Sequence, residues 1–445
     1  MILVIFSVAL FSRLYNLNDF PNFSIPDYPW VGTATGELKG LYHDERVYSN
    51  LATILITNPS HLTIYQPWLQ LLAIGASISI FSLSPFSVRL PSAIFSSVSI
   101  VLVYLICMHK FKNKLAACIS SLYLVVMVPA LIYNRMAFLE NGAALFFLAS
   151  YFCLIKYSEQ KREKYIILST IFAGLSFLSK VDGLIAPVFL IIYLASHKLL
   201  RRNIRFLALT AGLLLIFPVI ISLIYNFDLF ALFTMFTKQW KIGTVGYEFS
   251  VWVYLLLNSM PSGYVTIFSG YLQLEFWYIF AYIALIYLAT KEFEKVADIV
   301  LINTTFIALF LIAGGIGSYY LVLLQPFFAI PIGYAVTKLP HMASSLVTFL
   351  YLFLYAPVAL SIDIFINVGN QTGDLNNLLL VLFKLGTVIF PLLLLICTPI
   401  LEKKLKKEVR PITNILVLSL LFLFLFLGSY ILPVFYPHYL TPFLP

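Results

Sequence analysis

Apolar runs of about twenty residues recur along almost the whole chain, and short clusters of lysine and arginine separate them. Two examples are "LAACISSLYLVVMVPALIY" and "NILVLSLLFLFLFLGSYILPVF". A helix needs roughly 20 apolar residues to cross the hydrocarbon core of a bilayer, whereas membrane-barrel strands appear as segments of about ten residues with alternating polarity. The sequence therefore predicts an all-α polytopic membrane protein. Because spans pack together as one bundle, residues 1–445 are expected to form a single transmembrane domain.

Basic clusters predict the orientation of the spans, because cytoplasmic loops carry an excess of lysine and arginine. Of the 28 lysines and arginines, 19 lie in six such clusters, whereas 12 of the 19 acidic residues fall on the other side. The net charge of +9 thus encodes orientation, and no nucleic-acid partner is expected. The clusters are 109–114, 156–164, 197–205, 291–295, 338–341 and 402–410. The pattern gives about 13 spans with the N-terminus inside, near 2–18, 90–108, 115–133, 141–157, 165–180, 184–197, 206–225, 276–290, 296–313, 318–337, 343–362, 378–400 and 412–433.

Residues 19–88 are predicted to form a large first outer loop that carries two helices at the membrane interface. In "DERVYSNLATIL", Asp44 suits an N-cap and the residues Val47, Leu51, Ile54 and Leu55 make one apolar face. The second helix lies in "PWLQLLAIGASISIFSLSPF" (67–86), which begins with Pro and Trp and contains Gln70 and several serines. This segment is also long enough to span the membrane, and in that case Asp44 would face the cytoplasm with the basic clusters.

Three charged stretches would then meet at the outer face: "HDE" (43–45), "NRMAFLEN" (134–141) and "SKVDG" (179–183). Ionisable residues near a membrane are costly, so they tend to be paired or functional. Helix capping and interfacial anchoring are the simpler explanations of the same residues. A second outer loop, 226–275, places Lys238 and Lys241 beside tryptophans and tyrosines. That mixture suits a lipid phosphate, and it also suits an ordinary interfacial aromatic belt.

The order of these stretches resembles GT-C type glycosyltransferases that use polyprenyl-phosphate sugars, such as protein O-mannosyltransferases and aminoarabinose transferases of lipid A. The matching pieces are "SRLYNL", "HDERVYSNLA", "SPFSVRLPSAIFSSVSIVLVYL", "YNRMAFLENGAALFFLASYFCLI" and "GLSFLSKVDGLIAPVFLIIYL". They cover roughly residues 8–200. Where the family often has "HPPL" or "KPPL", this chain has "YQPWL", so Tyr65 stands in place of a basic residue.

The resemblance implies an inverting transfer of one sugar from a dolichyl or undecaprenyl phosphate carrier to a protein, lipid or glycan acceptor. Asp44 stands where the family has its general base, with Glu45 and Glu140 expected to assist. Donor phosphate contacts are expected from Arg135, Lys180, Lys238, Lys241 and Tyr65. A divalent ion (Mg²⁺, Mn²⁺ or Zn²⁺) is a candidate cofactor, with Asp44, His43 and Glu140 as ligands.

Two other readings fit parts of the sequence. Prolines inside predicted spans, Pro218 and Pro331, are compatible with a transporter or lipid flippase. The departures from the family pattern are compatible with an inactive scaffold of the same fold. All three readings place a multi-pass protein in the cell membrane among its lipids, and the transferase reading places the active face outside the cytoplasm.

Overall fold

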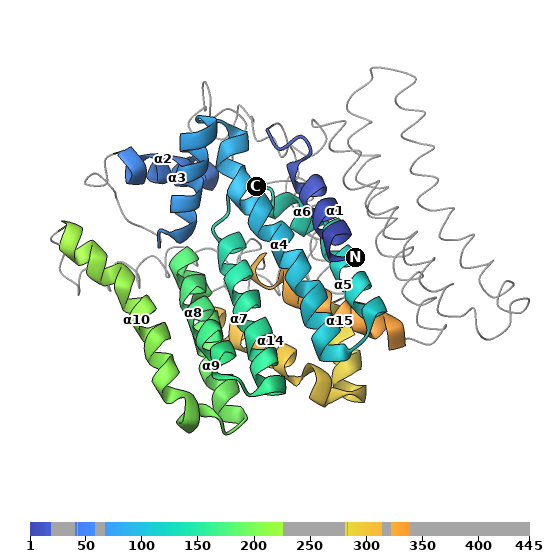
Figure 1. Ribbon diagram of the computed structural model, residues 1–445. Coiled ribbons are helices and arrows are strands. Elements are labelled where there is room, and N and C mark those ends of the chain that lie inside the picture. Colours follow the sequence, from blue (N-terminus) through green and yellow to red (C-terminus); the bar gives the residue numbers. More distant parts are fainter. Residues whose placement is uncertain are drawn as a thin grey trace, which may run out of the picture. The chain divides into compact units, whose positions relative to one another are not determined.

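The computed structural model describes residues 1–18, 41, 43–57, 67–225, 281–282, 284–313 and 322–338. Within these ranges the regular structure is helical, as predicted, and no strand occurs (Figure 1). Backbone contacts divide the chain into two compact units. The described residues up to Val125, from Pro129 to Tyr225, and from Ala281 to Tyr334 lie in the first unit. The prediction of a single domain with outer loops at 19–88 and 226–275 stays a prediction.

The first four helices coincide with elements predicted from the sequence. Helix α1 spans Ile2–Leu14 and packs along α4, which spans Pro85–Phe111. Between them come α2 (His43–Thr57) and α3 (Leu69–Phe81), which pack on each other. Helix α3 also packs on α4, and Figure 1 shows α2 and α3 together near the start of α4.

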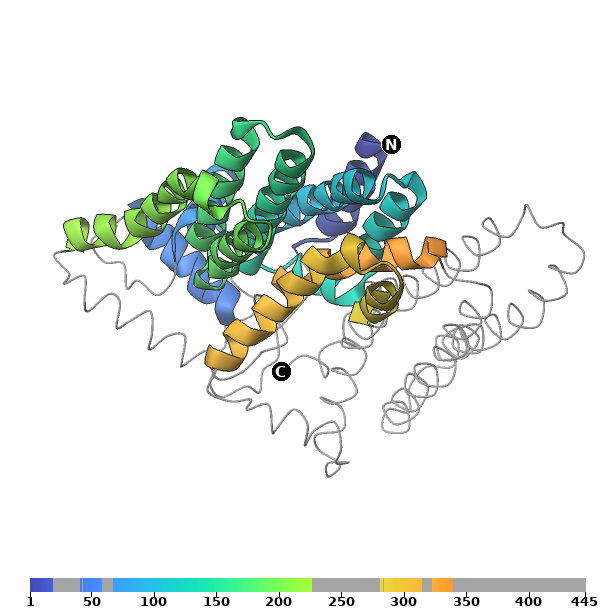
Figure 2. The ribbon, with the colours of Figure 1, turned by 90° about the horizontal axis from the view of Figure 1, so that it is seen from below.

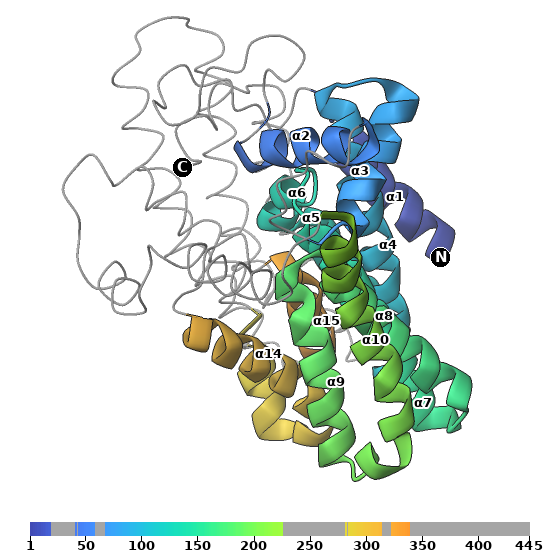
Figure 3. The same ribbon diagram turned by 90° about the vertical axis from the view of Figure 1, so that its left-hand side faces the viewer.

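Among the following helices, α8 (Glu163–Ser179) packs against α7 (Glu140–Gln160), α9 (Ile185–Ser196) and α10 (Leu200–Tyr225), and α14 (Phe293–Ala313) packs on α9. Figure 3 shows α7 to α10 side by side as an antiparallel group. Figure 2 shows α14 (gold) and α15 (orange) on one side of this group. The bounds are α5 Lys114–Val126, α6 Val128–Tyr133, α7 Glu140–Gln160, α8 Glu163–Ser179, η3 Val181–Leu184, α9 Ile185–Ser196, α10 Leu200–Tyr225, α14 Phe293–Ala313 and α15 Gln325–Lys338.

The start of α4 follows from its sequence, "SPFS". Ser84 is an extended N-cap whose side chain accepts from the backbone N–H of Ser87, and the Ser87 hydroxyl in turn accepts from the N–H of Ser84. Pro85 follows at the first helical position, where its missing N–H costs nothing. Two of the N–H groups that a helix start leaves without partners are thereby satisfied at the entry to a 27-residue helix.

One of the described helices, Pro85–Phe111, is by length and composition sufficient to cross a bilayer. Shorter apolar helices occur at Ile2–Leu14, Leu69–Phe81, Lys114–Val125 and Val181–Ser196. The predicted spans at 343–362, 378–400 and 412–433 lie outside the described residues. The count of 13 spans therefore stays a prediction. The 13-residue α3 matches the expected helix in 67–86 and would be only about 20 Å long, too short to cross the hydrocarbon core upright.

Two details of the predicted α2 are wrong. Asp44 lies inside the first turn, because the helix already begins at His43, so it is not the N-cap. Of the predicted apolar face only Leu51 is buried, together with Glu45, Tyr48, Ser49 and Ala52, whereas Val47, Ile54 and Leu55 are half-buried. The packing of α2 against α3 explains which face of α2 is buried. At Gly75 of α3 an added Cβ would lie 3.2 Å from the backbone oxygen of Ala52, so small residues meet where the two helices cross.

Candidate functional site

The first element of the candidate site is a fully buried ion pair between α2 and α4. Arg89 donates from Nε to Glu45 Oε1 and from Nη2 to Glu45 Oε2, each at 2.8 Å. Both side chains have no solvent exposure. Glu45 Oε1 also accepts from the backbone N–H of Ala137 at 3.0 Å, and Arg89 Nη1 donates to the carbonyl of Leu17 at 3.2 Å. One carboxylate thus joins α2 to α4 and to the 134–140 segment.

The two adjacent acids of "HDE" have different surroundings. Glu45 is committed to Arg89 and Ala137 and serves as a structural anchor. Asp44 is half-buried and precedes it in the first turn of α2. Successive residues of a helix are turned by about 100°, so Asp44 projects in a different direction from Glu45. Asp44 is therefore the better placed of the two to meet a substrate.

Gln70 of α3 binds the N-terminus of α7. Its Nε2 donates to the carbonyl of Phe138 at 2.7 Å and to the hydroxyl of Ser92 at 2.9 Å, while its Oε1 accepts from the N–H of Gly142 at 2.8 Å. Gln70 is fully buried. A Cβ at Gly142 would lie 2.5 Å from Gln70 Oε1, so glycine is what admits this contact. The amide satisfies one of the orphan N–H groups of the α7 start.

The third element is a buried group of two carboxylates and one ammonium. Lys180 Nζ contacts Glu140 Oε1, and it lies 3.0 Å from Asp182 Oδ2. The three side chains are 5%, 1% and 8% exposed, so solvent screens them little. Glu140 is the first residue of α7, where a negative charge complements the helix dipole. The predicted stretches 134–141 and 179–183 therefore meet in space.

Arg135, predicted to bind the donor phosphate, is fully buried beside the end of α1. Its Nη1 donates to the carbonyl of Ser12 at 3.3 Å, and its Nη2 donates to the carbonyl of Tyr15. Arg13 of α1 makes the reciprocal contact, donating to the carbonyls of Leu124 and Val125 at the end of α5. Both arginines thus satisfy carbonyls that helix ends leave without intrahelical partners. A contact of Arg135 with phosphate stays a prediction.

The remaining predicted contacts lie outside what the structure describes. Tyr65, Lys238 and Lys241 fall in ranges that are not described, and so does the side chain of His43. The residues that are described contain no group of three histidine, cysteine, aspartate or glutamate side chains suited to a metal ion. At Glu140 the Lys180 ammonium already occupies the position next to the carboxylate. This contact involves one oxygen of the Glu140 carboxylate, and the ligand set of His43, Asp44 and Glu140 stays a prediction.

Two residues that hold the helices of the candidate site together are not among the predicted site residues. Arg89 stands in "SVRLPSA", and a single charge in an apolar run requires a buried partner. The isolated charge of Arg89 indicates a buried partner, but the sequence does not identify that partner as Glu45, which is 44 residues away. Gln70 favours an interfacial helix in the sequence, and in the structure its amide also holds α3 against α7.

A close backbone contact holds the Lys180–Asp182 turn in place and gives a first prediction. A Cβ at Gly183 would lie 2.1 Å from the carbonyl oxygen of Ser176. Gly183→Ala is expected to destabilise the protein by about 1–3 kcal/mol through overpacking. We expect the same clash to displace the turn that carries Lys180. Unfolding of the purified protein measures the loss.

The matched control is Gly212→Ala in α10, where nothing lies within 4 Å and stability should be unchanged or slightly raised. Equal stability of both variants would contradict the prediction.

Part of this chain matches a known protein family, and its fold is similar to solved structures. Residues 65–222 match the model of the dolichyl-phosphate-mannose-protein mannosyltransferase family. The fold is similar to that of ArnT from Cupriavidus metallidurans, with a TM-score of 0.55 for the apo structure and 0.56 for the structure bound to undecaprenyl phosphate. In both cases the identity is 14%, and the match covers 96% of this chain and 76% of ArnT.

A third structure, the oligosaccharyltransferase AglB from Archaeoglobus fulgidus, matches at a TM-score of 0.46, with 16% identity over 88% of this chain and 55% of AglB. No curated protein matches by sequence. The matched family segment contains α3, α4, α7 and the Lys180–Asp182 turn. The resemblance to GT-C type membrane glycosyltransferases, predicted from the sequence, is confirmed by the family segment and by the fold of ArnT.

Proposed function

We propose that this protein transfers a sugar from a polyprenyl-phosphate carrier to an acceptor hydroxyl at the outer face of the membrane. The observation that carries the proposal is the Glu45 carboxylate, which binds both Arg89 and the N–H of Ala137. Through it, the helix bearing Asp44 is fixed against the segment that ends in Glu140. The matched family and ArnT bound to undecaprenyl phosphate supply the donor class.

In the proposed reaction Asp44 accepts the proton of the acceptor hydroxyl. The acceptor oxygen forms a bond to the anomeric carbon while the bond from that carbon to the phosphate oxygen breaks. The electron pair leaves with the polyprenyl phosphate, and the anomeric configuration inverts. Because a phosphate monoester is already a good leaving group, the reaction needs a base but no separate general acid. This distinguishes it from an inverting glycosidase, which needs both.

The buried group of Glu140, Lys180 and Asp182 has a net charge of −1 when all three are ionised. That sign suits the sugar, on which positive charge develops in an oxocarbenium-like transition state, better than it suits the donor phosphate. We therefore assign this group to the sugar side of the site. Lys238 and Lys241 are the proposed phosphate contacts.

The experiment supplies the purified full-length protein with radiolabelled polyprenyl-phosphate hexoses or with the corresponding nucleotide sugars. Label should appear in an acceptor, or in free sugar by hydrolysis, from the lipid-linked donor alone. Heat-denatured protein is the control. Release from the nucleotide sugar would overturn the assigned donor class. Movement of intact labelled lipid between leaflets, with its glycosidic bond preserved, would overturn the transferase in favour of a flippase.

A further inference from the structure

Three lysines adopt the left-handed backbone conformation where helices end. Lys112 follows α4 with φ 51°, Lys161 follows α7 with φ 53°, and Lys198 comes two residues after the end of α9 with φ 56°. All three are exposed. Glycine is the usual residue at such positions, because it adopts positive φ without steric cost. Lysine destabilises each turn relative to glycine, and what it adds is a positive charge.

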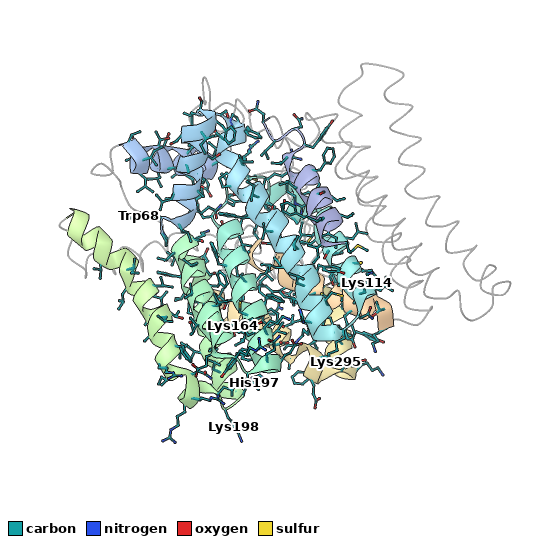
Figure 4. All side chains as sticks on the ribbon, in the orientation of Figure 1. Trp68, Lys114, Lys164, His197, Lys198 and Lys295 are labelled. Carbon is teal, nitrogen blue, oxygen red and sulfur yellow. The ribbon has the colours of Figure 1, made fainter. Side chains whose placement is uncertain are left out.

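These turns lie side by side at one end of the helix group. Lys156 Nζ lies 3.2 Å from His109 Nδ1 and joins α7 to α4. Tyr157 donates to Asn203 Oδ1 at 3.0 Å, and Arg205 pairs with Glu163 at 2.5 Å, so α10 joins the α7–α8 turn. Figure 4 labels His197 and Lys198 at the lower end of the view, whereas Trp68 at the start of α3 is in the upper part.

The surface formed by these turns is strongly basic. In segments 109–114, 156–164 and 197–205, all of them described, exposed lysines and arginines outnumber exposed acids by nine to two. Each lysine also interacts favourably with the negative end of its helix dipole. The further exposed charges of Arg162, Arg201 and Arg202 belong to the clusters that predict the cytoplasmic side of the spans, so this basic surface would face the cytoplasmic leaflet.

Apolar side chains are exposed on the same helices next to this charge. Ile204 of α10, two residues after Arg202, is 63% exposed, and Ile191 of α9, seven residues before Lys198, is 44% exposed. A ligand that meets both surfaces has an anionic headgroup and an acyl chain. Nucleic acid or free phosphate would match the charges but leave the apolar side chains in water.

We propose that this basic turn surface, formed by Lys112, Lys161, Arg162, Lys198, Arg201 and Arg202, binds the headgroups of anionic phospholipids. In this proposal, the charge that lysine adds at each turn contacts the headgroup. The surface lies away from α2 and α3, so the interaction is separate from the proposed transfer reaction and does not depend on it.

The test uses the full-length protein in neutral detergent, with phosphatidylglycerol or phosphatidylcholine added, and follows thermal unfolding as a function of lipid concentration. The variant Lys112→Gly/Lys161→Gly/Lys198→Gly removes three charges and relieves the strained turns. The matched control, Lys112→Arg/Lys161→Arg/Lys198→Arg, keeps the charges. A second variant, Arg201→Gln/Arg202→Gln, removes charge without touching the turns.

Wild type and the arginine control should be stabilised by phosphatidylglycerol and not by phosphatidylcholine. Each basic residue near an anionic surface contributes roughly a fivefold factor, so the glycine variant should bind about a hundredfold more weakly. The Arg201→Gln/Arg202→Gln variant should lose more than tenfold on the same basis. In phosphatidylcholine the glycine variant should unfold at the same temperature as wild type or higher, which shows that it folds.

Several results would overturn the proposal. Undiminished stabilisation of both charge-removing variants by phosphatidylglycerol would show that the surface is not the binding site. Equal stabilisation of wild type by phosphatidylcholine would show no headgroup preference. Equal stabilisation by inorganic phosphate would identify a free-ion site, and tighter binding of a DNA oligonucleotide would identify a nucleic-acid surface.

Discussion

Replacing Asp44 with asparagine is expected to reduce sugar transfer by roughly 10²–10⁴-fold, the range that a general base contributes. The substitution keeps the shape of the side chain and removes its capacity to accept the acceptor proton. Asp44 is half-buried in the first turn of α2, so the variant should lose only about 0.3–1 kcal/mol of stability from the helix dipole. The measurement is label transfer from polyprenyl-phosphate hexose, with the unfolding temperature recorded alongside.

Glu159→Gln is the matched control for this experiment. Glu159 is an exposed acid at the other end of α7, 3.6 Å from His109, so its loss changes the charge by the same amount far from Glu140. Transfer by Glu159→Gln should equal that of wild type. If folded Asp44→Asn retained activity within a few-fold of wild type, Asp44 would not be the base, and Glu140 would be the next carboxylate to test.

The sequence predicted the helices of the described region well because their signals are local. The capping serines and Pro85 mark the start of α4. The spacing of apolar residues in "DERVYSNLATIL" predicts a helix, and the structure has one at His43–Thr57. The same spacing predicts only part of the buried face of this helix. That face depends on the crossing with Gly75 of α3, and such a crossing follows from packing, which no local pattern of α2 contains.

For the candidate site, the sequence identified the right stretches but could not assign roles within them. Adjacent acids at 44 and 45 look equivalent in sequence, and only the contact with Arg89 shows that Glu45 is structural. Arg135 and Lys180 were both predicted to meet a phosphate. In the structure Arg135 holds the end of α1, and Lys180 is shared by two carboxylates. Partners more than a hundred residues apart, such as Ser12 and Arg135, become neighbours only through the packing of α1.

The ion pair of Glu45 and Arg89 gives the largest expected change in stability. Arg89→Met should destabilise the protein by about 3–5 kcal/mol, because it leaves a buried carboxylate without its counter-charge. Glu45→Gln should cost a similar amount, because Arg89 then carries an uncompensated charge. Glutamine nevertheless keeps an oxygen that can accept from the N–H of Ala137. Denaturant unfolding of the purified variants measures these losses.

The double variant Glu45→Gln/Arg89→Met tests whether Glu45 and Arg89 stabilise the protein as an ion pair or independently of each other. It buries neither charge and retains the acceptor for Ala137, so it should be more stable than Arg89→Met by about 2 kcal/mol or more. A second mutation that restores stability is the expected signature of a desolvated ion pair. If the two losses simply added, Glu45 and Arg89 would act independently, and α2 would have to be fixed against α4 by apolar packing. In that case the sugar-transfer activity of the double variant should be no higher than that of Arg89→Met. If the two residues act as a pair, the double variant should restore the position of α2, and its transfer activity should exceed that of Arg89→Met.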